Sequence, residues 1–255
     1  MIKRLISSDS KFFYLLDENM QTTHKVDMSS YMAGLDTVIF DPFKGPENFF
    51  AGSEKKSSGT AEDPRHFYSF RCVDGIVSEF QDHDINHILS KWSTPQLESF
   101  CFNPAGELVL LEDHPQNKLY FCSFVGGVVT LLRSLELGQF GLSSAQSVCY
   151  VPWMDAYLVS DNYLDKLMVI SESEGIIDEI LLNRISVIPT NCQGVAVDYE
   201  TRNIFLTSYV PEDAVIELTF GGKEVNYYPQ SVWETTPAQP YDNPTSIDIF
   251  QNPFR

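Results

Sequence analysis

One pattern recurs five times along this chain of 255 residues, and it constrains the fold more than any other feature. Each copy is a short run that is about half apolar, with a polar residue in second place: LDTVIFDP from Leu35, LESFCFNP from Leu97, AQSVCYVP from Ala145, CQGVAVDY from Cys192 and PTSIDIFQ from Pro244. In the middle three copies a second apolar run leads to a polar residue 15 positions after that second place, at Asp113, Asp161 and Ser208. A period of about fifty residues with several short strands per copy is typical of a β-propeller.

The two ends of the sequence complete one repeat between them. The N-terminus supplies three strand-like runs (KRLISSD, KFFYLLD and TTHKVDM) without a first run, and the C-terminus supplies that run, SIDIF. Pairing these ends removes a free sheet edge and closes a ring. The sequence therefore predicts an all-β fold, a single five-bladed β-propeller of four-stranded antiparallel blades, closed by pairing the N-terminal strands with the C-terminal strand.

The expected blades occupy residues 245–255 plus 1–29, 33–86, 95–138, 143–186 and 190–232 of one domain, 1–255. A six-bladed propeller is the alternative blade count. A two-sheet sandwich also has short strands at regular spacing, but it requires neither the split repeat nor the constant offset of 15 residues.

The charge of the chain limits its partners. A formal net charge of −18 repels phosphate backbones and anionic lipid surfaces, so nucleic-acid and membrane binding are not expected. A protein partner with a basic patch, or a small cationic or metal ligand, fits better. The five cysteines form no CxxC pair, and most lie in apolar runs where a free thiol packs as a small hydrophobe. Without a signal peptide or an apolar stretch of 18 residues, the chain is expected to be cytoplasmic or part of a larger soluble assembly.

The repeat is clearest at 194–203, GVAVDYETRN, which is followed by IFLTS and VIELTF. This resembles the repeat of NHL and YWTD propellers, in which G-[IV]-A-V-D, a turn and an aromatic-containing strand recur. The layout is more distantly similar to the gluconolactonase-type propellers. In those proteins an acidic or amide residue at the start of each first strand points to the channel mouth, and several of these residues hold a divalent cation.

The resemblance implies a metal-binding ring formed by the residues in second place: Asp36, Glu98, Gln146, Gln193 and Thr245. All five carry a side-chain oxygen, which suits a hard cation such as Ca²⁺. The sequence departs from the gluconolactonase type in two ways. Those enzymes have six blades, and they carry an asparagine and a catalytic aspartate where this ring has glutamines and a threonine.

A second set of residues closes the second strand of each blade and is expected to bind a ligand on the same face: Asp9, Glu54, Asp113, Asp161 and Ser208. Carboxylates gathered there would raise one another's pKa unless a cation or a lysine lay among them, and Lys118 and Lys166 each follow an acid by five residues. The alternative is that these residues cap the following turn by accepting backbone N–H groups. A histidine pair, His83 and His87, has helical metal-ligand spacing but no third ligand.

Two functions from different classes follow. The first is a non-enzymatic ligand- or protein-binding propeller with an acidic, cation-binding funnel, aided by protruding segments at 55–64 and 233–242. The alternative is a metal-dependent lactonase- or esterase-like hydrolase, in which Asp161 or Asp113 activates water. A glycosidase using Asp36, Glu98 and Asp161 is a weaker alternative. The oligomeric state is left open.

Overall fold

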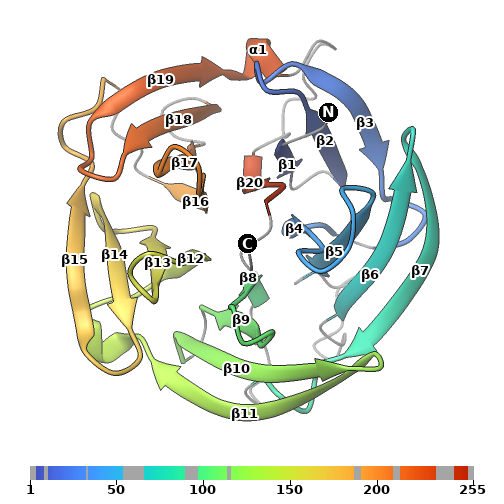
Figure 1. The fold of residues 1–255 in the computed structure, drawn as a ribbon, viewed down its shortest axis with the longest axis horizontal. Helices are drawn as coiled ribbons and strands as arrows, with labels where there is room; N and C mark the ends of the chain where they lie inside the picture. Colours follow the sequence, from blue (N-terminus) through green and yellow to red (C-terminus); the bar gives the residue numbers. More distant parts are fainter. Residues whose placement is uncertain are drawn as a thin grey trace.

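A computed structural model describes residues 4–8, 11–32, 34–53, 66–89, 97–113, 116–186, 191–208, 213–233 and 244–251. Within these residues, twenty strands form five four-stranded antiparallel sheets. Figure 1 shows the sheets arranged around a central axis like the blades of a fan. The chain is therefore a five-bladed β-propeller, and the predicted fold class is confirmed.

Each blade runs from an innermost strand beside the axis to an outermost strand on the rim (Figure 1). Blade 1 is β20 (Pro244–Ile249), β1 (Arg4–Ser8), β2 (Phe12–Leu16) and β3 (Thr22–Asp27). Blade 2 is β4 (Thr37–Phe40), β5 (Asn48–Ser53), β6 (His66–Val73) and β7 (Ile76–Asp84). Blade 3 is β8 (Leu97–Phe102), β9 (Leu108–Glu112), β10 (Lys118–Val125) and β11 (Val128–Glu136). Blade 4 is β12 (Ala145–Val151), β13 (Ala156–Asp161), β14 (Lys166–Ser171) and β15 (Gly175–Leu181). Blade 5 is β16 (Cys192–Val197), β17 (Asn203–Ser208), β18 (Ala214–Thr219) and β19 (Glu224–Pro229).

The hydrophobic pattern of each strand follows from its distance to the axis. The second strands are covered by neighbouring blades on both faces, and β9 and β13 are accordingly buried along their whole length. The outermost strands have a solvent-exposed side, and β15 alternates between covered and exposed residues. The core therefore lies between the blades, in clusters shared by adjacent sheets.

The two ends of the chain close the ring as predicted. Strand β20 pairs antiparallel with β1, with Ile249 opposite Arg4 and Ile247 opposite Ile6. The Ser7 hydroxyl lies 3.0 Å from the Thr245 hydroxyl and 2.5 Å from that of Ser246. This ladder joins the first and last described strands into one sheet.

The outermost strands follow one another around the rim (Figure 1), and two histidines join blade 2 to blade 3 there. His83, at the end of β7, donates from Nδ1 to the carbonyl oxygen of Gly127 at 3.0 Å, and its Nε2 accepts from the Ser69 hydroxyl at 2.8 Å. The Nε2 of His87 lies 2.9 Å from the carbonyl oxygen of Val129. The histidine pair considered as metal ligands thus holds blade 2 to blade 3.

Two short helices accompany the strands in the described part of the chain, η1 (Gly138–Phe140) and α1 (Gln230–Trp233). Trp233 is 0 % exposed and packs edge-on against Tyr14, with ring centroids 5.5 Å apart. The expectation that Trp233 belongs to a protruding contact segment is therefore wrong, because its ring fills the core between blades 5 and 1. Residues 234–242 and the expected loop at 55–64 lie outside the described residues. None of the helices in the described ranges is long and apolar enough to cross a membrane.

Candidate functional site

The residues in second place start the innermost strands at one end of the channel, and four of them coincide with β-bulges. The ladder register shifts between Leu97 and Ser99, between Ala145 and Ser147, and between Cys192 and Gly194. A fourth shift lies opposite Thr245. Glu98, Gln146, Gln193 and Thr245 are therefore the extra residues of these bulges, whereas Asp36 precedes β4 and donates its N–H to the carbonyl of Gly52 at 3.1 Å. Bulges redirect side chains and are frequent beside functional sites.

Asp161 is held by backbone groups from two directions. Its Oδ2 accepts the N–H groups of Ser143 and Ser144 at 2.7 and 2.8 Å, and its Oδ1 accepts the N–H of Tyr163 at 2.8 Å. The side chain is 1 % exposed. This carboxylate fastens the connection into blade 4 and caps the turn after β13, an arrangement that suits a structural cap better than a general base.

Asp113 and Gln146 are brought together across blades 3 and 4. The Oδ2 of Asp113 lies 3.4 Å from the Nε2 of Gln146 and 3.1 Å from the hydroxyl of Ser144. The Nε2 of Gln193 donates to Asn191 at 2.5 Å and to the Oδ1 of Asn162 at 3.5 Å. Sequence reasoning missed the intermediary residues, although Ser144 lies two positions before Gln146 and Asn162 directly follows Asp161.

Four more of the predicted residues are described, and they occupy the same end of the propeller. Asp36 and Glu98 are half-buried, Ser208 is buried at the end of β17, and Thr245 contacts Ser7. Asp9 and Glu54 lie outside the described residues. The expected counter-charges form cross-strand ion pairs with the outermost strands: Lys118 with Glu136 at 2.7 Å, and Lys166 with Glu179 at 2.6 Å.

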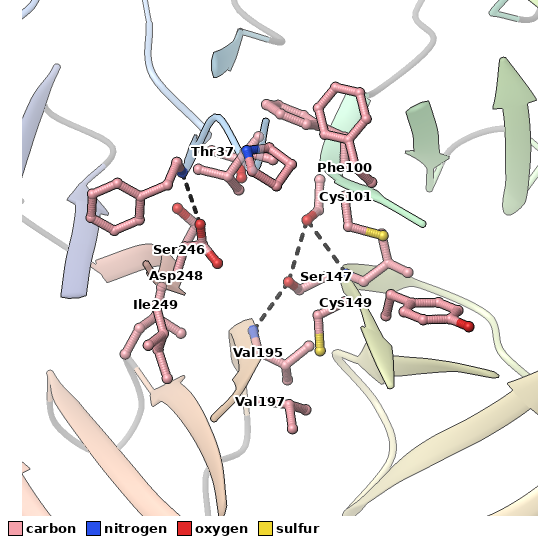
Figure 2. A pocket seen from close by; sticks show the side chains of 18 of the residues that line it. Thr37, Phe100, Cys101, Ser147, Cys149, Val195, Val197, Ser246, Asp248 and Ile249 are labelled. Carbon is pink, nitrogen blue, oxygen red and sulfur yellow. Dashed lines mark hydrogen bonds between the residues drawn. The ribbon is translucent and has the colours of Figure 1, made fainter. Parts of the chain in front are cut away.

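A set of four hydroxyl residues directly follows the second-place residues and lines the channel, and we call it the hydroxyl collar: Thr37, Ser99, Ser147 and Ser246. Figure 2 labels Thr37, Ser147 and Ser246. Three of the collar hydroxyls accept an N–H from the innermost strand of the next blade. Ser246 accepts from Val38 at 3.2 Å, Ser99 from Val148 at 3.4 Å and Ser147 from Val195 at 3.1 Å. An innermost strand has no sheet partner on its channel side, so these bonds satisfy donors that would otherwise be orphaned.

Blade 5 has a glycine where the other blades have a collar hydroxyl. A Cβ atom on Gly194 would lie 2.8 Å from the Cα of Ser246 and 2.9 Å from the nitrogen of Ile247. The innermost strands of blades 5 and 1 therefore approach too closely for any side chain. Thr37 differs from the other three collar residues in another way, because its hydroxyl has no hydrogen-bond partner within the described part of the chain.

Two positions further along the innermost strands, four blades have Ile39, Cys101, Cys149 and Ala196, and blade 1 has Asp248. Asp248 borders the central cavity, which has about 60 Å³ of space open to water-sized molecules (Figure 2). Its Oδ2 accepts the N–H of Phe40 at 2.8 Å. Burial raises the pKa of Asp248 to about 7, and the hydrogen bonds from Phe40 and Ile249 only partly oppose this. Asp248 as a whole residue is half-buried, and it is among the residues that line this cavity.

The donor set at the mouth gives little support to a metal centre. Within the ranges that the structure describes, no three His, Cys, Asp or Glu side chains gather closely enough to hold an ion. The side-chain amides of Gln146 and Gln193 donate to neighbouring oxygens, and Asp36 and Glu98 are the carboxylates of the ring. Calcium binding at the ring therefore stays a prediction.

Comparison with known proteins finds solved structures with a similar fold. No family model and no curated protein matches the sequence. A protein of unknown function from Bacteroides caccae has a similar structure, with 10% identity, a TM-score of 0.60 and coverage of 98% of this chain and 100% of that one. A chain of the nidogen/laminin complex has 10% sequence identity and a TM-score of 0.57, and the match covers 99% of each chain. A candidate 6-phosphogluconolactonase from Bacteroides uniformis has 11% sequence identity and a TM-score of 0.52, and the match covers 94% of this chain and 84% of that one.

The chain shares its fold with these propellers. The expected resemblance to gluconolactonase-type propellers is confirmed at the level of the fold. Identities of 10 to 11% carry the architecture and no particular activity.

Proposed function

We propose that this chain is a non-enzymatic binding propeller whose acidic channel mouth receives a basic surface of a protein partner. The observation that carries this proposal is the size of the channel, which offers about 60 Å³. Sites for small organic molecules commonly measure roughly 300–1,000 Å³. A sugar lactone does not fit into such a channel, so recognition falls to the surface around it.

The electrostatics of the mouth support the same function. Asp36, Glu98 and Asp113 lie half-buried at one end of a protein with a net charge of −18. Such a field attracts basic partners over a distance and raises their association rate, most strongly at low ionic strength. The similar fold of a chain in the nidogen/laminin complex supports a protein partner, because that structure is of a protein assembly.

The test uses peptides selected from a random library on the immobilised protein. We expect the selected peptides to be rich in lysine and arginine, and to bind about ten-fold more weakly to the double variant Asp36→Asn/Glu98→Gln. The matched control is Asp178→Asn/Glu179→Gln, which removes the same two charges from the rim strand β15. Peptides without basic enrichment, or equal losses in both variants, would contradict the proposal.

A second candidate is the metal-dependent lactonase- or esterase-like hydrolase, which is favoured by the fold similarity to the candidate 6-phosphogluconolactonase. Asp113 would be its base, because both oxygens of Asp161 already accept backbone N–H groups. A panel of lactones and aryl esters, assayed with calcium and with a chelator, separates the two functions. Metal-dependent turnover that Asp113→Asn abolishes would establish the hydrolase.

A further inference from the structure

The central channel contains a carboxylate that has no counter-charge among the described residues lining the cavity. Asp248 is the acidic residue among the described residues that line the cavity, and that lining includes no Lys, Arg or His. One of its oxygens accepts the N–H of Phe40 at 2.8 Å. Asp248 as a whole residue is only partly buried, and it lines the cavity (Figure 2).

The titratable groups around Asp248 remain neutral. Cys101 and Cys149 come from blades 3 and 4, and Tyr150 and Tyr199 border the same cavity. Burial raises the pKa of all four groups, so the thiols and phenols keep their protons at pH 8.5. When Asp248 ionises, it is the one charge in the described wall, and an isolated charge in such a place is costly.

The same cavity offers oxygen ligands and room for an ion. Ser99, Ser147 and Ser246 of the hydroxyl collar line it. Thr37 lines it too, with a side chain that is 1 % exposed and a hydroxyl that has no partner within the described ranges. The volume of about 60 Å³ accommodates an ion with a few waters, since one water needs roughly 10–15 Å³ of such space.

We propose that the central channel binds a small monovalent cation, such as Na⁺ or K⁺, between Asp248 and the oxygen atoms of the hydroxyl collar. One carboxylate neutralises one positive charge, whereas a divalent ion would leave a net charge in a wall of neutral groups. The site is distinct from the ring of second-place residues at the mouth, and it does not depend on the proposed partner.

The test is thermal unfolding at pH 8.5 and constant ionic strength, in NaCl, KCl or N-methyl-D-glucamine chloride, whose cation is too large for the cavity. We expect Tm to be higher by about 3 °C or more in the small cations, because a ligand that binds only the folded state stabilises it. At pH 5 the proton occupies Asp248, and the difference between the salts disappears.

Variants assign the effect to its site. Asp248→Asn should remove the dependence on the cation, while Asp178→Asn on the exposed strand β15, which loses the same charge, should retain it. Equal Tm values in all three salts at pH 8.5 would overturn the proposal, and so would an undiminished cation effect in Asp248→Asn. If the Asp248→Asn variant does not fold, the wild-type protein still tests the proposal. A difference in Tm between the salts that persists in the wild type at pH 5 would also refute the site.

Discussion

The close packing of blade 5 against blade 1 depends on Gly194, and replacing this residue by alanine tests that dependence directly. The new Cβ atom would lie 2.8 Å from the Cα of Ser246, 2.8 Å from the hydroxyl of Thr207 and 2.9 Å from the nitrogen of Ile247. Two of these atoms belong to the backbone of β20, so no side-chain rotation relieves the overlap. Blade 5 must move away from blade 1 instead.

The expected cost follows from overpacking. Extra methyl groups in a packed core typically cost about 1–3 kcal/mol, and here rigid backbone lies on one side. We expect Gly194→Ala to lower the free energy of unfolding by about 3 kcal/mol, measured by urea denaturation followed by tryptophan fluorescence.

The matched control is Gly138→Ala, because a Cβ there meets nothing within 4 Å. This control should change the free energy of unfolding by less than about 1 kcal/mol. If Gly194→Ala were as stable as the control, the close approach of β16 and β20 would not be a constraint, and this account of the contact between blades 5 and 1 would fail.

Three further predictions concern single side chains. Asp161→Asn should lower the free energy of unfolding by about 2 kcal/mol in the same denaturation assay, since charge-assisted bonds to three backbone N–H groups are weakened; a change under about 0.5 kcal/mol would contradict the capping role. Burial lowers the pKa of His83 below 6.5, so the unfolded chain takes up the proton first and stability falls as the pH drops below 6.5. The decrease of the free energy of unfolding with falling pH should be smaller in His83→Phe and unchanged in His24→Ala. If calcium binds the mouth, it raises the Tm and Glu98→Ala abolishes the rise; indifference to both calcium and chelator would end that hypothesis.

Much of the fold could be predicted, because the repeated apolar runs indicate the strands and the repeat divided between the two ends indicates a closed ring. The run SIDIF near the C-terminus supplies the strand that the N-terminal runs lack, and β20 pairs with β1 as expected. The bulge at Glu98, in strand β8 (Leu97–Phe102), was not predicted. Such a bulge cannot be recognised from the sequence, because an extra residue in a strand leaves no mark on a pattern of apolar residues.

The candidate site could be predicted less completely, because its contacts join residues far apart in the sequence. Asp161 was recognisable as a repeated polar position, but its partners Ser143 and Ser144 come from the preceding connection. Asp248 occupies a place that is apolar or a thiol in the other four blades, and nothing in the run SIDIF marks it as facing a cavity. Trp233 was misassigned because Pro and Thr in the residues after it suggested an exposed segment.

The shared sheet of blade 1 also imposes an order on folding. Ser7 and Thr245, which lie side by side in that sheet, are 238 positions apart along the chain. During synthesis, strands β1 to β3 therefore lack their partner strand β20 until the other strands have left the ribosome. Pairings between such distant segments form slowly, and the unpaired edge is open to wrong partners in the meantime. A chaperone that shields the edge of β1 during synthesis would raise the yield of closed rings more than one acting on blades 2 to 5.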